Sequence, residues 1–306
     1  MAVDDAMGAG EREPAVATAF EAHRRLLTGL AYRMLGTLAE AEDVVQDAWL
    51  RLARADADAI DDLGAWLTTV VSRLCLDRFR AARAVRETYV GPWLPEPVVT
   101  DPRVAPDPAA VIEVDDSVRL ALLVVLERLT PEQRVAFVLH DVFGVPFEDV
   151  ARTLGTTPAA ARQLASRGRR AARAAGSGEA VPPDRQARTL EAFRRATLAG
   201  DLEGLVAVLA PDVTWRSDGG GLVPAALRPV VGAEKVARLL LGLAQQVGPG
   251  AEVRDVLVNG EPGVLVVAEV PASRGPRTVL LPHLGVDGRV HAIDVVRSPE
   301  KLRRVT

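Results

Sequence analysis

The stretch that decides the fold class reads Val145-Pro146-Phe147-Glu148-Asp149-Val150-Ala151-Arg152-Thr153-Leu154-Gly155-Thr156-Thr157-Pro158. It is typical of a helix-turn-helix, because Ala151 is small enough for two helices to touch, Gly155 permits the turn and Pro158 begins the second helix. Residues 151–173 carry six arginines and no acidic residue. This pattern predicts DNA binding; the alternative is an ordinary amphipathic helix with a solvated arginine face.

The second helix of this motif carries its arginines at helical spacing, so one face of it can follow DNA. Residues in the first turns of such a helix reach base edges, which makes Arg162 and Gln163 the expected base readers. Arg167, Arg169 and Arg170 are expected to neutralise phosphates. The full set of expected contacts is Thr157, Arg162, Gln163, Ser166, Arg167, Arg169, Arg170 and Arg173.

Two further runs of like charge lie earlier in the chain. Residues 73–86 carry five arginines against Asp77 alone, whereas residues 40–47 carry four acidic residues and no basic one. An acidic helix cannot face phosphate, so its expected partner is a basic protein surface, with a solvated helix face as the alternative. A basic helix and an acidic helix that are neighbours in the chain favour a protein that bridges DNA and another protein.

Proline-rich and glycine-rich segments divide the chain into three blocks. Residues 92–108 hold six prolines, which remove backbone donors and prevent a continuous helix. Residues 174–186 read as a second linker. The expected domains are 15–88, 111–173 and 187–306, joined by linkers at 89–110 and 174–186.

Apolar spacing indicates the secondary structure of each block. Apolar residues recur every three or four positions through 26–35, 44–52 and 66–75, which predicts helices with one buried face. In the second block, Thr130-Pro131-Glu132-Gln133 is a strong helix start. The third block predicts helices at 187–199, 201–209 and 233–247 and strands at 213–217, 251–258, 263–270, 277–284 and 289–297.

The order of these elements indicates the fold class. Asn259-Gly260 and Asp287-Gly288 are typical of turns between neighbouring antiparallel strands. The chain is therefore expected to be a multidomain, mainly α protein, with two helical domains followed by an α+β domain built on a curved sheet.

Composition excludes several classes of protein. The apolar run Leu120 to Leu126 is far shorter than the roughly 20 residues needed to cross a bilayer, and the acidic amino-terminal segment is not typical of a secretory signal. Cys75 is the only cysteine, which excludes an internal disulfide and a cysteine-rich metal site, and its apolar neighbours predict a core thiol. A cytoplasmic protein without a metal or cofactor, and without membrane contact, is expected.

Motifs in the first two blocks resemble those of one known family. Residues 31–36 (Ala-Tyr-Arg-Met-Leu-Gly) and 41–51 (Ala-Glu-Asp-Val-Val-Gln-Asp-Ala-Trp-Leu-Arg) are similar to the conserved second region of extracytoplasmic-function (ECF) sigma factors. Residues 65–80 resemble the segment that melts and reads the −10 promoter element. Residues 129–134 (Leu-Thr-Pro-Glu-Gln-Arg) and the helix-turn-helix resemble the fourth region, which reads the −35 element.

This resemblance implies particular partners and contacts. The partners are promoter DNA and core RNA polymerase, through its β′ clamp helices and its β flap. The implied clamp contacts are Glu42, Asp43, Gln46, Asp47 and Arg51. The implied −10 contacts are Arg73, Asp77, Arg78, Arg80 and Arg83.

Three motifs in the rest of the chain resemble marks of the sigma J-like ECF group, whose members append a SnoaL-like domain of the nuclear-transport-factor-2 fold. The motifs are Trp93-Leu94-Pro95-Glu96-Pro97, Asp218-Gly219-Gly220-Gly221 and Ser298-Pro299-Glu300-Lys301-Leu302. Leu222 stands where the group has a lysine after the glycine triplet. The resemblance implies that the extension contacts the linker and the core regions and tunes activity. The first two motifs supply the expected interdomain regulatory residues.

SnoaL-like folds also house polyketide cyclases and steroid isomerases, which use a pocket Asp or His as general base. The available candidates are Asp212, Asp218, His283, His291 and Asp294, but nothing spaces them as a motif. A regulatory protein–protein domain is therefore preferred to an isomerase, a cyclase or a small-molecule sensor.

The sequence thus predicts a sigma factor that directs RNA polymerase to promoters, is modulated by its own C-terminal domain and is not itself an enzyme. The alternative from another class is a ligand-responsive helix-turn-helix repressor. A repressor would not need the acidic helix at 40–51, which distinguishes the two hypotheses.

Overall fold

The computed structural model describes residues 4–56, 59–87, 89–104, 119–174, 181–247, 250–271 and 275–305. The chain forms two compact units. The first comprises Met1–Arg83, Pro106–Ser117 and Leu126–Arg170, and the second comprises Ala84–Ala105, Val118–Val125 and Ala171–Thr306. The segments expected to be linkers lie partly outside the described residues, at 105–110 and 175–180.

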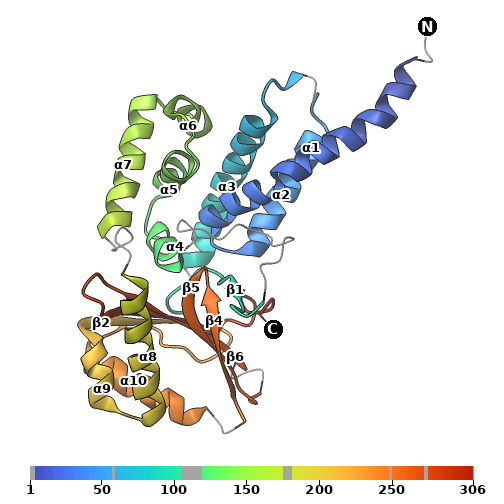
Figure 1. Cartoon of the computed structure of the whole chain (residues 1–306). Coiled ribbons are helices and arrows are strands. Elements are labelled where there is room, and N and C mark those ends of the chain that lie inside the picture. Colours follow the sequence, from blue (N-terminus) through green and yellow to red (C-terminus); the bar gives the residue numbers. More distant parts are fainter. Residues whose placement is uncertain are drawn as a thin grey trace. The chain divides into compact units, whose positions relative to one another are not determined.

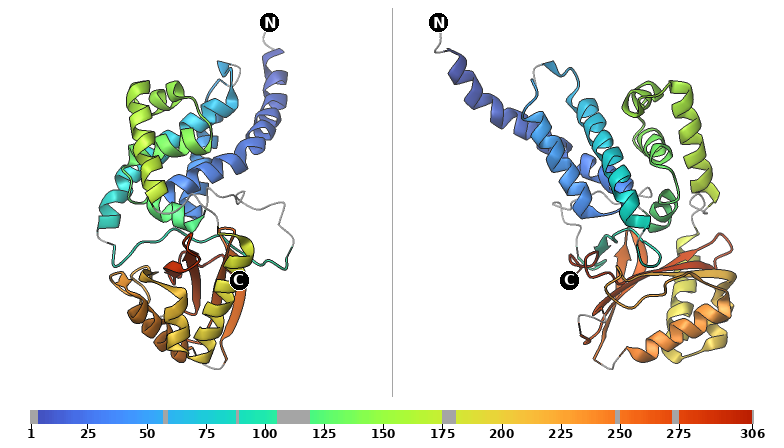
Figure 2. Two further views of the ribbon diagram at one scale, coloured as in Figure 1. Left: turned by 60° about the vertical axis from the view of Figure 1, so that its left-hand side comes forward. Right: turned by 180° about the vertical axis from the view of Figure 1, so that it is seen from behind.

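The first unit begins with three helices, α1 (Asp4–Leu35), α2 (Leu38–Leu52) and α3 (Leu63–Glu87), seen from two sides in Figure 2. Thr37 caps α2, because its hydroxyl accepts a hydrogen bond from the Glu40 backbone N–H. The apolar spacing that predicted these helices marks their buried faces, with Leu27 and Val44 fully buried. Leu26 is the exception and is 49% exposed.

The helix-turn-helix region follows the short helix α4 (Leu120–Leu126). It consists of α5 (Pro131–Phe137), the π-helix η3 (Val138–Val142), α6 (Phe147–Leu154) and α7 (Pro158–Ala174). Thr130 and Gln133 form the predicted capping box at the start of α5. Gly155 ends α6 with φ of 64°, a left-handed conformation that favours glycine. The predicted helix-turn-helix is confirmed.

Close packing of α7 against α5 depends on Gly168. A Cβ atom at this position would lie 2.7 Å from the Phe137 Cβ and 3.3 Å from the Gln133 carbonyl oxygen. We expect Gly168→Ala to lower the free energy of unfolding by about 1–3 kcal/mol, because neither helix can move without disturbing the core. Urea unfolding measures this change.

The matched control for Gly168→Ala is Gly242→Ala. Gly242 lies inside helix α10 (Ala233–Gln246), and a Cβ there would meet no atom within 4 Å. The higher helix propensity of alanine should stabilise that variant by up to about 1 kcal/mol. Equal stability changes in the two variants would contradict the close contact at Gly168.

One seven-stranded sheet organises the second unit, in the order β1-β4-β5-β6-β7-β2-β3. The strands are β1 (Val99–Thr100), β2 (Leu209–Asp218), β3 (Val230–Val231), β4 (Glu252–Val258), β5 (Glu261–Val267), β6 (Arg277–Leu284) and β7 (Val290–Val296). Strands β4 to β7 form an antiparallel meander, and β2 runs parallel to β7. Asn259 and Gly260 both have positive φ in the β4–β5 turn, as the Asn-Gly pair predicted.

Three helices, α8 (Pro183–Ala199), α9 (Leu202–Val208) and α10, gather on one face of this sheet (Figure 1). Their apolar side chains form a core with Trp215 of β2 and Ile293 of β7. The predicted α+β architecture with a curved sheet is therefore confirmed, with α8 starting four residues earlier than the sequence suggested.

The opposite face of the sheet carries a second core. Val258 and Leu281 of the sheet pack there with Leu94, Leu120 and, near the end of the chain, Leu302. In addition, β1 adds to the sheet edge, since Val99 pairs with Val258 and Thr100 with Leu257. Part of the proline-rich segment is thus built into the α+β unit, a role that its composition did not indicate.

Candidate functional site

The exposed face of α7 brings together most of the residues predicted to contact the −35 element. Ala161, Ala165, Gly168 and Ala172 line the buried side of the helix. The residues on its outward side are Arg162, Gln163, Arg167, Arg170 and Arg173, with Ser166 and Arg169 half-buried. Thr157 caps the helix, its hydroxyl accepting from the Ala160 N–H at 3.2 Å. We call the exposed set the α7 arginine face.

Two arginines of α7 already have contacts within the chain. The Arg169 Nε donates to the Asp141 carboxylate at 2.6 Å, and this hydrogen bond raises the pKa of the guanidinium. The Arg162 guanidinium lies over the Phe147 ring, 5.6 Å from the ring centre. The Phe147 ring in turn stacks on the His140 ring. Arg169 is therefore a weaker candidate for a phosphate contact than Arg170, since part of its charge is neutralised locally.

The outward face of α2 is acidic, as the sequence indicated. Asp43, Gln46 and Arg51 are exposed, and Glu42 and Asp47 are half-buried. Leu50 lies on the same face and is 44% exposed. We call this set the α2 acidic face. An acidic helix face with an exposed apolar side chain is suited to docking on a basic protein surface that also offers an apolar contact.

The residues predicted to contact the −10 element lie on α3, but they do not form one free surface. Arg78 Nη2 is 3.0 Å from Asp47 Oδ2 and Nη1 is 3.4 Å from Asp43 Oδ2, and these partners raise the Arg78 pKa, against the effect of its burial. Arg73 and Asp77 are exposed. The side chains of Arg80 and Arg83 lie outside the described part of the structure. The basic and acidic helices therefore interact directly, which their separate charge runs did not reveal.

Asp218 is the centre of a buried polar cluster in the second unit. Its side chain is fully buried and accepts hydrogen bonds from the Tyr89 hydroxyl at 2.5 Å, the Leu94 N–H at 2.8 Å and the Gly220 N–H at 2.9 Å. Lys301 Nζ donates to Asp218 Oδ2 at 2.7 Å and to the Leu94 carbonyl at 2.5 Å. The buried charge of Asp218 is thus paired, as burial requires.

Aromatic side chains cover this Asp218 cluster. The Lys301 ammonium lies 4.0 Å from the centre of the Trp93 ring and 5.4 Å from that of Tyr89, which are cation–π distances. Burial, followed by the hydrogen bond to Asp218, raises the pKa of Tyr89, so its hydroxyl stays a donor. Sequence reasoning identified Trp93, Leu94 and Asp218 but missed Tyr89 and Lys301; the only signal for Lys301 was its place in the Ser298–Leu302 motif.

The glycine triplet after Asp218 allows close approach of neighbouring backbone. A Cβ on Gly219 would lie 2.2 Å from the Val223 carbonyl oxygen, and one on Gly220 would lie 2.7 Å from the Ser298 hydroxyl. Gly220 and Gly221 have φ of 69° and 72°. Steric contact therefore excludes a side chain at Gly219, the backbone conformation disfavours one at Gly221, and both effects act at Gly220. Pro95, Glu96 and Pro97, the other predicted regulatory residues, follow Leu94 and are buried.

The candidate general bases of the α+β unit do not meet in a pocket. The Asp294 side chain is fully buried. Its carboxylate lies 2.8 Å from His283 Nε2 and 2.6 Å from Arg216 Nε. Burial acts to raise the Asp294 pKa, but His283 and Arg216 together lower it. Ile293 and Val295 point into the helix-covered core, so Asp294 points to the opposite face. Asp212 is exposed, and His291 pairs with Asp287 on the surface.

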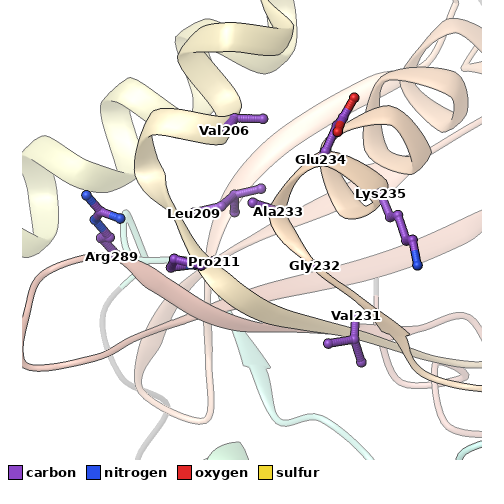
Figure 3. A pocket seen from close by; sticks show the side chains of 9 residues that line it. All are labelled: Val206, Leu209, Pro211, Val231, Gly232, Ala233, Glu234, Lys235 and Arg289. Carbon is purple, nitrogen blue, oxygen red and sulfur yellow. The ribbon is translucent and has the colours of Figure 1, made fainter.

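An open pocket of about 540 Å³ lies where β2, β3 and the start of α10 meet. Figure 3 shows the residues that line it. Val206, Leu209 and Pro211 form its apolar wall, and Lys235 and Arg289 lie at its edge. None of the five candidate general bases named from the sequence lines it, and the carboxylate in its lining is that of Glu234. Within the described ranges, no set of three or more His, Cys, Asp or Glu side chains is arranged to hold a metal ion, and no helix is both long and apolar enough to span a membrane.

Comparison with protein families defines the class. Residues 19–85 match Sigma-70 region 2 and residues 119–171 match Sigma-70, region 4. With both regions and the geometry above, the chain is a sigma factor, which directs RNA polymerase to promoters and initiates transcription. It is 48% identical over 291 residues to the ECF RNA polymerase sigma factor SigJ of Mycobacterium tuberculosis, covering 92% of this chain and 91% of SigJ. The chain belongs to the ECF RNA polymerase sigma factors.

Two further comparisons agree with this family. The probable ECF RNA polymerase sigma factor SigI of Mycobacterium tuberculosis is 41% identical over 229 residues, covering 74% of this chain and 76% of SigI. The crystal structure of Mycobacterium tuberculosis SigJ matches with a TM-score of 0.77 at 44% identity, covering 94% of this chain and 98% of that one. The predicted fold, two helical sigma domains and a SnoaL-like α+β domain, is confirmed.

Proposed function

We propose that this sigma factor divides its contacts among three surfaces. The α2 acidic face docks on the β′ clamp helices of core RNA polymerase, α3 contacts the −10 element and the α7 arginine face contacts the −35 element; the helix-turn-helix region also docks on the β flap. The supporting observation is that the charged side chains of α2 and α7 lie mostly on the outward side of their helix, whereas the opposite side of each of these two helices is apolar and buried. Such a protein works in the cytoplasm, where polymerase and promoters are.

We further propose that the SnoaL-like domain regulates the sigma regions by holding the proline-rich segment. This segment leads from the −10 helix toward the −35 region, so fixing it limits how the two DNA-reading regions can move. The Asp218 cluster carries the proposal, since it ties Leu94 to Asp218 and Lys301, residues more than 120 positions further along the chain. Domain contacts of this kind are reversible, and a shift in population is enough for regulation.

A regulatory role is favoured over isomerase, cyclase or sensor activity. His283 and Asp294, the pair with the best geometry for proton transfer, are engaged with each other and with Arg216 on the face opposite to the helices. The open pocket of Figure 3 contains neither of them. The alternative of a ligand-responsive repressor has no support from the family matches.

Base reading and phosphate binding are separated by two substitutions on α7. Arg162→Ala should relax the preference for the −35 sequence, costing roughly 1–3 kcal/mol on the preferred duplex if Arg162 contacts a guanine. Arg170→Ala should weaken binding to all duplexes alike and reduce the salt slope of the affinity by about one. Binding titrations on preferred and scrambled duplexes at several salt concentrations measure both effects.

The two substitutions serve as controls for each other, because each removes one exposed arginine from the same helix. Equal losses on every duplex for both variants would show that Arg162 is not a base reader. A loss of sequence preference in Arg170→Ala would reverse the two roles.

A further inference from the structure

Arg134 joins the two sigma regions from a buried position that the proposed DNA and polymerase contacts do not use. It lies in α5, within region 4, and is 2% exposed. Its Nη1 donates to the Met34 carbonyl of region 2 at 2.5 Å and to Glu127 Oε1 at 2.6 Å, and its Nε donates to the Leu126 carbonyl at 2.8 Å. One guanidinium therefore serves acceptors from both regions.

The surroundings of Arg134 suit a fixed cation. Met34 is in the last turn of α1, where the backbone carbonyl groups give the helix end a negative potential. Phe79 of α3 lies below the guanidinium, 4.8 Å from it to the ring centre. The Glu127 carboxylate neutralises the buried positive charge of Arg134. The planar guanidinium also fixes the directions of its hydrogen bonds, so its contacts are specific in geometry.

Two more arginine contacts connect the same regions. Arg73 of α3 donates through Nη2 to the Arg152 carbonyl of α6 at 3.0 Å, and the Arg33 guanidinium lies 5.3 Å from the centre of the Phe143 ring. Arg73 is one of the proposed −10 contacts, and α6 belongs to the −35 reading motif. The proposed −10 helix is thus hydrogen-bonded directly to the first helix of the helix-turn-helix that carries the −35 contacts.

Promoter geometry is incompatible with this link. The positions −10 and −35 are about 25 base pairs apart, which corresponds to about 85 Å of duplex at roughly 3.4 Å per base pair. A protein that occupies both elements must place its reading helices at comparable separation. The arrangement in which Arg73 contacts Arg152 cannot do so, and regions 2 and 4 must come apart before both elements are bound.

We infer that Arg134 is the latch of a closed state of the sigma regions in which the −10 and −35 elements cannot be occupied together. This inference rests on the proposed assignment of α3 and α7 to the two elements. Loss of the latch raises the open fraction, and the apparent affinity for a complete promoter rises in proportion. A duplex with only the −35 element needs no opening, because the α7 arginine face is exposed in the closed state.

The first test measures opening without DNA or polymerase. Nitroxide labels at Ala22→Cys on α1 and Ala159→Cys on α7 report the distance between the regions in the full-length chain, since both positions are exposed and the native Cys75 is buried. Arg134→Met should shift the distance distribution to longer values. Arg128→Met, which removes an exposed arginine six residues earlier, should leave it unchanged. An unchanged distribution in Arg134→Met would overturn the inference.

The second test measures binding to a complete promoter and to a −35-only duplex. Arg134→Met should tighten binding to the complete promoter by about fivefold or more, with no change on the −35-only duplex. Equal changes on both duplexes would contradict the latch, whereas failure of the wild-type chain to bind the −35-only duplex more tightly than a scrambled duplex would contradict the proposed DNA contacts instead. If Arg134→Met does not fold, Arg134→Lys keeps the charge without the planar fork and should give an intermediate shift; wild-type distances in a folded Arg134→Lys would also contradict the inference.

Discussion

Binding to core RNA polymerase should be abolished in the double variant Asp43→Arg/Asp47→Arg. Both carboxylates lie on the α2 acidic face, and reversing them places two positive charges against a basic partner surface, which costs several kcal/mol in such interfaces. The reversal also places the two new positive charges beside Arg78. The milder variant Asp43→Asn/Asp47→Asn removes the negative charges without adding positive ones, and it should show a partial loss of binding. Pull-down with core polymerase at moderate salt measures both.

The control for this reversal is Asp184→Arg/Glu191→Arg. These two acidic residues are also exposed on one helix, α8, and each is paired with an arginine of that helix. Polymerase binding by this control should equal that of the wild-type chain, and a cooperative thermal unfolding transition shows that each variant is folded. Retained binding by a folded Asp43→Arg/Asp47→Arg variant would remove α2 from the polymerase interface.

Lys301→Met should release the proline-rich segment from the SnoaL-like domain. The substitution leaves the fully buried Asp218 carboxylate without its cation, and breaking a buried ion pair in this way costs about 3–5 kcal/mol. The Leu94 amide, which donates to Asp218, should lose hydrogen-exchange protection. Adding Asp218→Asn should recover part of the stability, because no buried charge then remains unpaired.

Lys235→Met is the matched control for Lys301→Met, since these are the only two lysines in the chain and Lys235 is exposed at the start of α10. Exchange at Leu94 should be unaffected by it. If Lys301→Met leaves protection at Leu94 intact, the Asp218 cluster does not hold the segment.

Truncation is a less direct test of the SnoaL-like domain than these substitutions. A chain ending near residue 215 is cut within β2, and it loses the strands that cover Leu94, Leu120 and Val124. The exposed apolar side chains would promote association, so altered transcription would not report regulation alone.

Local patterns in the sequence predicted the secondary structure well. The capping box at Thr130, the left-handed Gly155 and the Asn259-Gly260 turn each depend on only a few neighbouring residues, and each is present in the structure. Cys75, predicted to be a core thiol, is fully buried, and its burial raises its pKa. Strong local signals of this kind agree with the global fold in natural sequences.

Contacts between distant segments could not be predicted in the same way. Nothing near Val99 indicates that it pairs with Val258, because a two-residue edge strand has no pattern of its own. Likewise, the pairing of Arg78 with Asp43 and Asp47 joins two charge runs that the sequence could only assign to separate partners. Such contacts depend on how helices and strands pack against one another, and this packing cannot be inferred from composition or from the spacing of residues.

Run-off transcription with core RNA polymerase on a cognate promoter tests most directly whether the SnoaL-like domain regulates the sigma regions through the Asp218 cluster. Wild-type, Lys301→Met and Lys235→Met chains are compared at equal polymerase binding. We predict that Lys301→Met raises transcript yield by about fivefold or more, whereas Lys235→Met matches the wild type. Regulation through this cluster would be contradicted if all three chains gave equal transcript yields while the Leu94 amide of Lys301→Met had lost its protection from hydrogen exchange.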